Sequence, residues 1–143
     1  SQRKDIMNAI KKLKELSKEA TRQRYPNFPE EAISTPVYTD KTANGLTKCI
    51  IDYIRFFGGY ATRINTTGQI RQGKWVKGTT SLGTADIHAC IKGIHYSIEV
   101  KIGKDRMSVH QRETQCKVES AGGIYMIARN FEGFVDHLSQ PNQ

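Results

Sequence analysis

Apolar and polar residues alternate along residues 83–101, with one interruption at Lys92 and Gly93. A period of two residues is typical of β-strands that bury one face. Two such runs joined by two turn residues predict a β-hairpin. The other elements of the chain are therefore expected to cover the apolar face of this hairpin.

The opposite face of the predicted hairpin is charged. Counting outwards from the turn pairs Asp86 with Glu99 and places Lys101 on the same face. A shift of the register by two residues would pair Asp86 with Lys101 instead, but it would keep all three side chains together. The apolar face carries Ile87, Ala89, Ile91, Ile94, Tyr96, Ile98 and Val100.

The start of the chain predicts a basic helix and a linker. Apolar residues recur at near-helical spacing among lysines and arginines in residues 1–24, which predicts an amphipathic helix. Such a helix could pack on the core, contact phosphates or form a dimer. Residues 25–40 contain three prolines, which interrupt regular structure. We expect an appendage at residues 1–40 and the main domain at residues 41–143.

The remaining pattern alternates between helices and strands. In chain order we expect a helix at residues 42–57 with Asp40 or Thr42 as its N-cap, a strand at 60–65, a loop at 66–82, the hairpin, a helix from Ser108 to Gly122, a strand at 124–128 and a helix after Asn130. This order predicts an α/β fold, in which helices flank a mixed central sheet of about four strands.

Length, charge and cysteine content narrow the class of protein. A chain of 143 residues suits one domain. It has 22 Lys and Arg against 14 Asp and Glu, and a net charge of +8 is consistent with a polyanionic partner. Three widely spaced cysteines predict a reducing compartment rather than a disulfide framework. Neither a membrane span nor a signal peptide is predicted, so we expect a soluble cytoplasmic protein.

Basic residues gather just before the charged hairpin. Between Tyr53 and Ala85 there is no acidic residue, but five basic ones occur: Arg55, Arg63, Arg71, Lys74 and Lys77. This imbalance favours a phosphate backbone nearby. Trp75 falls in the predicted loop, where it could stack on an exposed base, but we expect it to anchor the loop to the core.

The charged face of the hairpin suggests a metal site. Carboxylates on directly opposite strand positions repel each other unless a cation or a shared proton lies between them. Mg²⁺ is often held by one or two carboxylates, with water and substrate phosphate oxygens as its other ligands. His88, Cys90 and His95 share this face and offer zinc ligands, but their spacing is not a usual zinc pattern and we expect them to be packing residues.

Three short motifs resemble the PD-(D/E)XK nuclease superfamily, and within it the virus-type replication-repair nuclease (VRR-NUC) domain. They are Gly-Thr-Ala-Asp at residues 83–86, Glu-Val-Lys at 99–101 and Ser-Val-His-Gln at 108–111. The resemblance covers about residues 43–134. Two departures stand out: Ala85 replaces the proline of the superfamily name, and the acid usual on the first core helix is absent, with Asn44 the nearest candidate.

The resemblance implies a restriction-endonuclease-like core and a Mg²⁺- or Mn²⁺-dependent endodeoxyribonuclease. Asp86 and Glu99, with the carbonyl of Val100, would be the metal ligands, and Lys101 would orient the attacking water. Gln111 would support the site from the next helix, although Ser108 and Gln111 also form a capping-box pattern. The expected DNA contacts are Arg63, Asn65, Arg71, Lys74, Lys77 and Lys104.

The expected setting is replication or repair of branched or flap DNA in a phage or mobile element, and a homodimer is left open. One alternative is an inactive nucleic-acid-binding module on the same fold, favoured by the missing helix acid. Another is a small interaction domain whose basic helix contacts an acidic protein.

Overall fold

The computed structural model describes residues 8–64, 69–76, 78 and 81–140. Its elements are α2 (Asn8–Arg24), the 3₁₀ helix η1 (Glu30–Ala32), α3 (Ala43–Phe56), β1 (Tyr60–Arg63), β2 (Gln69–Arg71), β3 (Lys74–Val76), β4 (Ile87–Ile91), β5 (Ile94–Val100), α4 (Val109–Ser120), β6 (Ile124–Ala128) and α5 (Phe131–Ser139). They form the predicted α/β fold.

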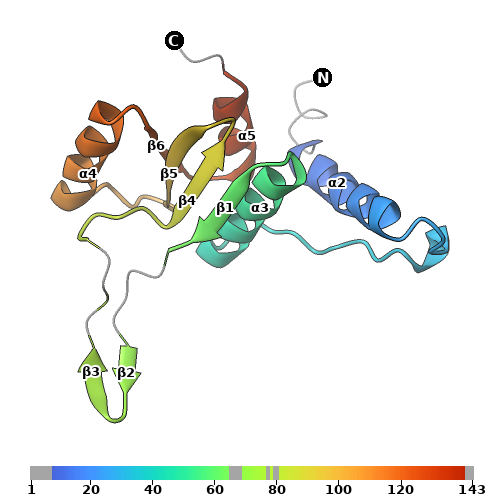
Figure 1. Ribbon diagram of the computed structural model, residues 1–143, viewed down its shortest axis with the longest axis horizontal. Helices are drawn as coiled ribbons and strands as arrows, with labels where there is room; N and C mark the ends of the chain where they lie inside the picture. The colour runs from blue at the N-terminus through green and yellow to red at the C-terminus, as the bar shows by residue number, and fades with distance from the viewer. Residues whose placement is uncertain (1–7, 65–68, 77, 79–80, 141–143) are drawn as a thin grey trace.

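Four strands form a mixed sheet in the order β1-β4-β5-β6. β1, β4 and β5 are antiparallel neighbours, and β6 runs parallel to β5. In Figure 1, α2, α3 and α5 lie on one side of this sheet and α4 lies on the other. The sheet therefore has two covered faces, of which one carries the charged residues.

The β4–β5 hairpin has the predicted turn and register. Lys92 and Gly93 have φ angles of 50° and 81°, as a type I′ turn requires. Ile87 pairs with Ile98, so the next pair outwards is Asp86 and Glu99. The alternative register, with Asp86 opposite Lys101, is therefore excluded.

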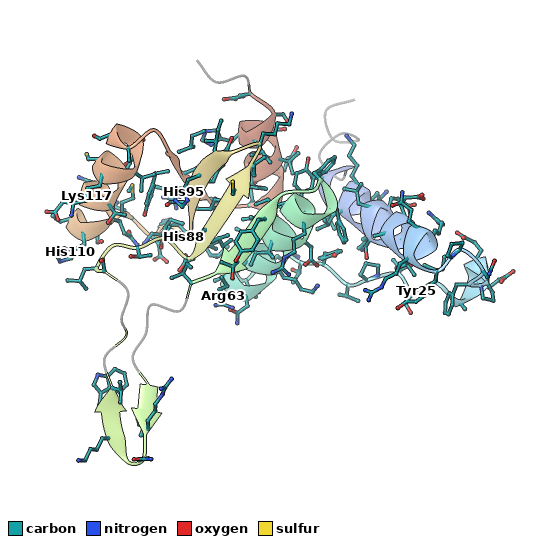
Figure 2. All side chains as sticks on the ribbon, in the orientation of Figure 1. Tyr25, Arg63, His88, His95, His110 and Lys117 are labelled. Atoms are coloured by element: carbon teal, nitrogen blue, oxygen red, sulfur yellow. The ribbon has the colours of Figure 1, made fainter. Side chains whose placement is uncertain are left out.

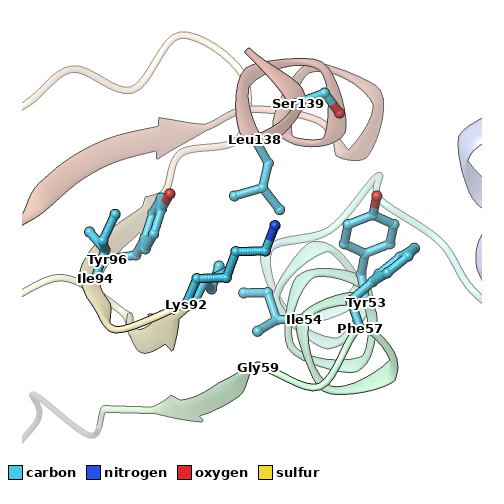
Figure 3. Close-up of a pocket in the computed structure, with 10 residues that line it drawn as sticks. Tyr53, Ile54, Phe57, Gly59, Lys92, Ile94, Tyr96, Leu138 and Ser139 are labelled. Carbon is cyan, nitrogen blue, oxygen red and sulfur yellow. The ribbon is translucent and has the colours of Figure 1, made fainter. Parts of the chain in front are cut away.

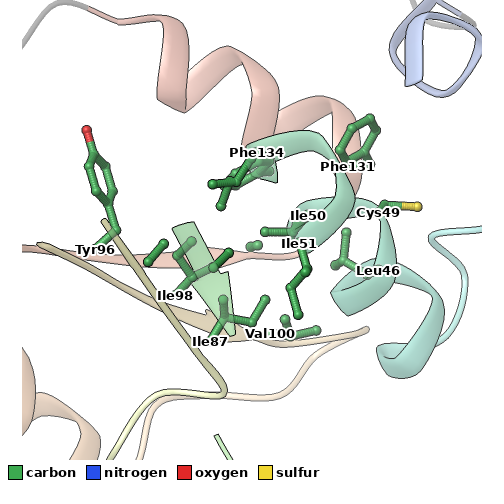
Figure 4. Close-up of a cluster of buried hydrophobic side chains, with 14 of the residues drawn as sticks. Leu46, Cys49, Ile50, Ile51, Ile87, Tyr96, Ile98, Val100, Phe131 and Phe134 are labelled. Atoms are coloured by element: carbon green, nitrogen blue, oxygen red, sulfur yellow. The ribbon is translucent and has the colours of Figure 1, made fainter. Parts of the chain in front are cut away.

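The core lies between the sheet and the helices α3 and α5. Phe131 and Phe134 of α5 pack with Leu46 and Ile50 of α3 over Ile87 and Ile98 of the sheet (Figure 4). Leu13 of α2 is also fully buried and belongs to this cluster. The basic helix is thus packed on the main domain through its apolar stripe.

The predicted helix starts are present. The Thr42 hydroxyl accepts a hydrogen bond from the Gly45 amide at 3.0 Å, which makes Thr42 the N-cap of α3. Asp40, the other candidate, accepts instead from the Phe131 amide at the start of α5, at 2.9 Å. Asn130 caps α5 through the Gly133 amide.

The prediction of a loop at residues 66–82 is wrong for its middle part, which forms a hairpin of β2 and β3. Gln72 and Gly73 make the turn with φ angles of 51° and 73°. The sequence did not reveal this hairpin, because Gln-Gly is a less familiar turn pair than Asn-Gly and each strand has only three residues. The predicted strand at 60–65 also ends earlier, at Arg63.

The hairpin of β2 and β3 projects away from the body of the molecule (Figure 1). Trp75 is 68% exposed, so the prediction that it anchors this segment to the core is wrong. A projecting two-stranded ribbon has no core beneath it into which an indole ring could be packed. Asn65 and Lys77, two of the predicted DNA contacts, lie outside the described residues.

All three cysteines are free, Cys49 buried and Cys90 and Cys116 exposed, as expected without a disulfide framework. Among the residues that the structure describes, no helix combines the length and the apolar character needed to cross a membrane.

Candidate active site

Asp86 is fixed between two strands at the edge where β4 begins. One of its carboxylate oxygens, Oδ2, accepts a hydrogen bond from the Val100 amide of β5 at 2.9 Å. Its backbone carbonyl accepts from the Ile64 amide, just after β1, at 2.8 Å. These two bonds hold the carboxylate on the face of the sheet that α4 covers.

Glu99 lies on β5, next to the end of the strand, and is only 5% exposed. Its Oε1 accepts a hydrogen bond from the Gln111 amide group at 2.9 Å and lies 4.0 Å from the Lys101 ammonium. The other oxygen, Oε2, is buried and has no hydrogen-bond partner among the described residues.

The surroundings of Glu99 favour its protonated form. Burial is the main cause, the negative charge of Asp86 and a side-chain hydrogen bond with Asp86 add to it, and together they raise the pKa of Glu99 to about 7 although Lys101 opposes the shift. A carboxyl with such a pKa exchanges its proton near neutral pH, and a divalent cation could replace that proton.

Gln111 makes two sets of hydrogen bonds, one in the predicted capping box and one to Glu99. Its backbone amide donates to the Ser108 hydroxyl at 3.1 Å and its side-chain oxygen accepts from the Ser108 amide at 2.9 Å, which completes a capping box at the start of α4. Its side-chain NH₂ remains available and donates to Glu99. The helix start therefore orients a carboxylate of the sheet.

Tyr125 of β6 is a site residue that the sequence did not reveal. It is 5% exposed, and its hydroxyl has no hydrogen-bond partner within the described part of the chain. Tyr125 pairs with Ser97, two residues before Glu99, so it lies on the same face as both acids. Burial, followed by the charges of Glu99 and Asp86, raises the pKa of this phenol and keeps it a neutral donor.

The donor set fits a hard divalent cation. Asp86 and Glu99 lie on one face of the sheet and supply two carboxylates, whose oxygens are the ligands that such a cation prefers. Among the described residues, no group of three or more His, Cys, Asp or Glu side chains could hold a metal ion. A cation at this site would therefore have at most two carboxylate ligands, with its other ligands coming from elsewhere. Val100, whose carbonyl is the third predicted ligand, ends β5 between Glu99 and Lys101.

The alternative of a zinc site is not supported. Figure 2 labels His88 and His95 on the side of the sheet toward α4. Their ring centroids are 5.1 Å apart, and Nε2 of His95 is hydrogen-bonded to the Ser97 hydroxyl at 2.7 Å. Cys90 forms no metal-binding group with them in the described chain. Burial, then the neighbouring His95, lowers the pKa of His88, which favours a neutral packing residue.

Asn44 does not join the acids through any hydrogen bond between described residues. Its Oδ1 accepts from the Arg63 guanidinium at 2.9 Å, where the chain leaves β1. The fold thus uses Asn44 to hold one predicted DNA contact, Arg63. Lys104, another predicted contact, is exposed on the turn after β5, and Arg129 fixes that turn by donating to the carbonyls of Gly103 and Asp105.

An apolar pocket lies at the opposite end of β4 and β5, beside the Lys92-Gly93 turn (Figure 3). Its walls include Tyr53 and Ile54 of α3, Tyr96 of β5 and Leu138 of α5. Because it is at the far end of the strands from Asp86 and Glu99, it is not part of the charged site.

No known family model and no curated protein matches this chain. The family assignment therefore stays a prediction from the three motifs.

Proposed function

We propose that this chain is a Mg²⁺- or Mn²⁺-dependent nuclease that hydrolyses phosphodiester bonds in DNA. The observation that carries the proposal is the pair of acids, Asp86 and the buried Glu99, on one face of the sheet, with Lys101 4.0 Å from Glu99 and Gln111 of α4 donating to it. Two such acids repel each other when both are ionised, and a cation between them would remove this repulsion.

Each residue has a distinct part in this proposal. Asp86 and Glu99 would hold the cation, and a bound cation would lower the pKa of its water and neutralise charge on the phosphate. Lys101, whose side chain is 14% exposed, would orient the attacking water and stabilise negative charge on the phosphate. Gln111 keeps Glu99 in place from α4.

Charge supports DNA as the partner. The net charge is +8, and the stretch from Tyr53 to Ala85 contains basic but no acidic residues. The likeness of the motifs to VRR-NUC domains supports a role in phage or mobile-element DNA replication or repair, in the cytoplasm, with branched or flap DNA as substrate.

The test is cleavage of linear, nicked and branched DNA with Mg²⁺, Mn²⁺ or EDTA. We expect cleavage that depends on the cation and that Asp86→Asn and Lys101→Ala each reduce by at least about 100-fold, with DNA binding largely kept. Lys92→Ala is the matched control, because it removes a lysine from the turn at the other end of the same hairpin. Equal cleavage by Lys101→Ala and Lys92→Ala would disprove the proposed role of Lys101.

A second candidate is a nucleic-acid-binding module without catalysis. It is favoured by the lack of an acid at the start of the first core helix, where Asn44, the nearest candidate, is hydrogen-bonded to Arg63 instead. The same assay separates the two functions, because such a module would bind DNA but show no cation-dependent cleavage in any variant.

A further inference from the structure

The segment that contains the hairpin of β2 and β3 leaves the body of the molecule beside the candidate site. The hydrogen bond between the Ile64 amide and the Asp86 carbonyl closes the base of the segment that contains it. The returning chain is fixed on α4, where the Thr114 hydroxyl donates to the Leu82 carbonyl at 3.3 Å. Gly83 lies so close to the His110 backbone that a side chain would collide with it. The segment that carries the β2–β3 hairpin therefore begins beside Asp86, one of the two carboxylates proposed to bind the metal.

The two faces of this hairpin differ in character. Ile70 pairs with Trp75, so both side chains lie on one face, and they are 73% and 68% exposed. The other face carries Arg71 and Lys74, which pair with each other, and Val76, which is 44% exposed. Large apolar side chains on a projecting ribbon are costly in water and indicate a partner surface.

The charge of the hairpin favours one occupant. The segment carries basic and no acidic residues within a chain of net charge +8, so a second copy would be repelled, whereas a polyanion would be attracted. Among polyanions, nucleic acid also offers flat apolar base faces, on which aromatic side chains stack. In a continuous duplex these faces are covered by neighbouring bases. An unpaired nucleotide exposes them.

We propose that this hairpin reads the structure of the DNA: Trp75, with Ile70 beside it, stacks on an unpaired base next to the cleavage site, while Lys74 on the opposite face contacts the phosphate backbone. This inference rests on the proposed function for its substrate. It predicts that the protein binds DNA with an unpaired nucleotide, such as a flap, a gap or a junction, more tightly than continuous duplex.

Trp75 is the only tryptophan of the chain, so its fluorescence reports on this contact alone. The Lys101→Ala protein is titrated in EDTA with a duplex and with the same duplex containing a short single-stranded gap. We expect the gapped DNA to quench the fluorescence strongly and the duplex to leave it almost unchanged. Equal quenching by both DNAs would overturn the inference, and so would an absence of quenching at saturation.

Variants test the contribution of the ring to affinity. Trp75→Ala should weaken binding of gapped DNA by roughly 5- to 150-fold, the range for loss of one stacking aromatic, and change duplex binding little. Trp75→Phe should restore part of the loss. Tyr25→Ala is the matched control, since it removes another exposed aromatic ring far from the hairpin (Figure 2). An equal loss for Tyr25→Ala, or none for Trp75→Ala, would overturn the inference.

Two further outcomes separate this inference from its rivals. If the hairpin instead covers a second copy of the chain, Trp75→Ala will convert a dimer to a monomer without DNA, which overturns the inference. If gapped DNA selectively quenches the fluorescence but the wild type cleaves no DNA, the proposed nuclease activity is refuted and the proposed stacking of Trp75 is supported. If the wild type cleaves DNA but shows no selective quenching, the nuclease activity is supported and the stacking is refuted.

Discussion

Glu99 combines deep burial with a second acid on the same face of the sheet. Its Oε1 accepts a hydrogen bond from Gln111, and the neighbouring acid is Asp86. The resulting pKa of about 7 means that ionisation of Glu99 at neutral pH is unfavourable when no cation is bound. The same feature makes the site receptive to a cation, since ligand binding releases the proton.

This pKa predicts how the stability of the metal-free protein depends on pH. The folded-state pKa is raised from 4.5 to about 7, so the stability that Glu99 contributes is fully present below pH 4.5 and is lost as the pH rises through 7. In EDTA, the wild type should lose on the order of 1–3 kcal/mol more than Glu99→Gln between pH 5 and pH 8. Chemical denaturation at both pH values measures this difference.

The control for this experiment is Glu15→Gln, which neutralises an exposed glutamate on α2. It should follow the wild type over the same pH range. Parallel pH curves for the wild type and Glu99→Gln would show that Glu99 ionises normally in the folded protein.

At the scale of elements, the start of α4 couples helix capping to the site. Gln111 uses its oxygen for the capping box and its NH₂ for Glu99. One residue thus positions the helix on the sheet and the carboxylate in the site.

Two substitutions separate these roles. Gln111→Glu keeps an oxygen for the cap but replaces the donor to Glu99 with a repelling oxygen, so cleavage should fall by roughly 10- to 100-fold. Ser108→Ala removes the Ser108 hydroxyl from the cap and should cost ~1 kcal/mol of unfolding free energy while cleavage is largely kept. Thermal melts and cleavage rates of both variants provide the comparison. If Ser108→Ala loses more cleavage activity than Gln111→Glu, Gln111 affects the site only by capping α4 and not through its bond to Glu99.

The elements also show what the sequence could reveal. The β4–β5 register followed from a two-residue turn and strict alternation, which are local signals. Tyr125 was missed because β6 is parallel to β5 and reaches it through α4, so no turn sets their register. The β2–β3 hairpin was missed because each of its strands has only three residues and its Gln72-Gly73 turn is a less familiar pair than Asn-Gly. Trp75 was misplaced for the same reason.

At the scale of the whole molecule, the hairpin proposed to bind DNA and the proposed catalytic residues lie at one edge. Asp86, at the start of β4, and Glu99, near the end of β5, share the edge from which the basic hairpin projects (Figure 1). α2, α3 and α5 occupy the opposite face of the sheet. A polyanion bound along the hairpin, as proposed, would therefore reach the carboxylates.

The central claim is that Asp86 and Glu99 together bind a divalent cation. Titration of the protein with Mn²⁺ at pH 8, followed by calorimetry, measures this directly. The account predicts saturable binding that Asp86→Asn and Glu99→Gln each weaken by at least about 10-fold and that becomes weaker below pH 7 as Glu99 takes up a proton. Binding that is unchanged in both variants, or an absence of binding by the wild type, would contradict it.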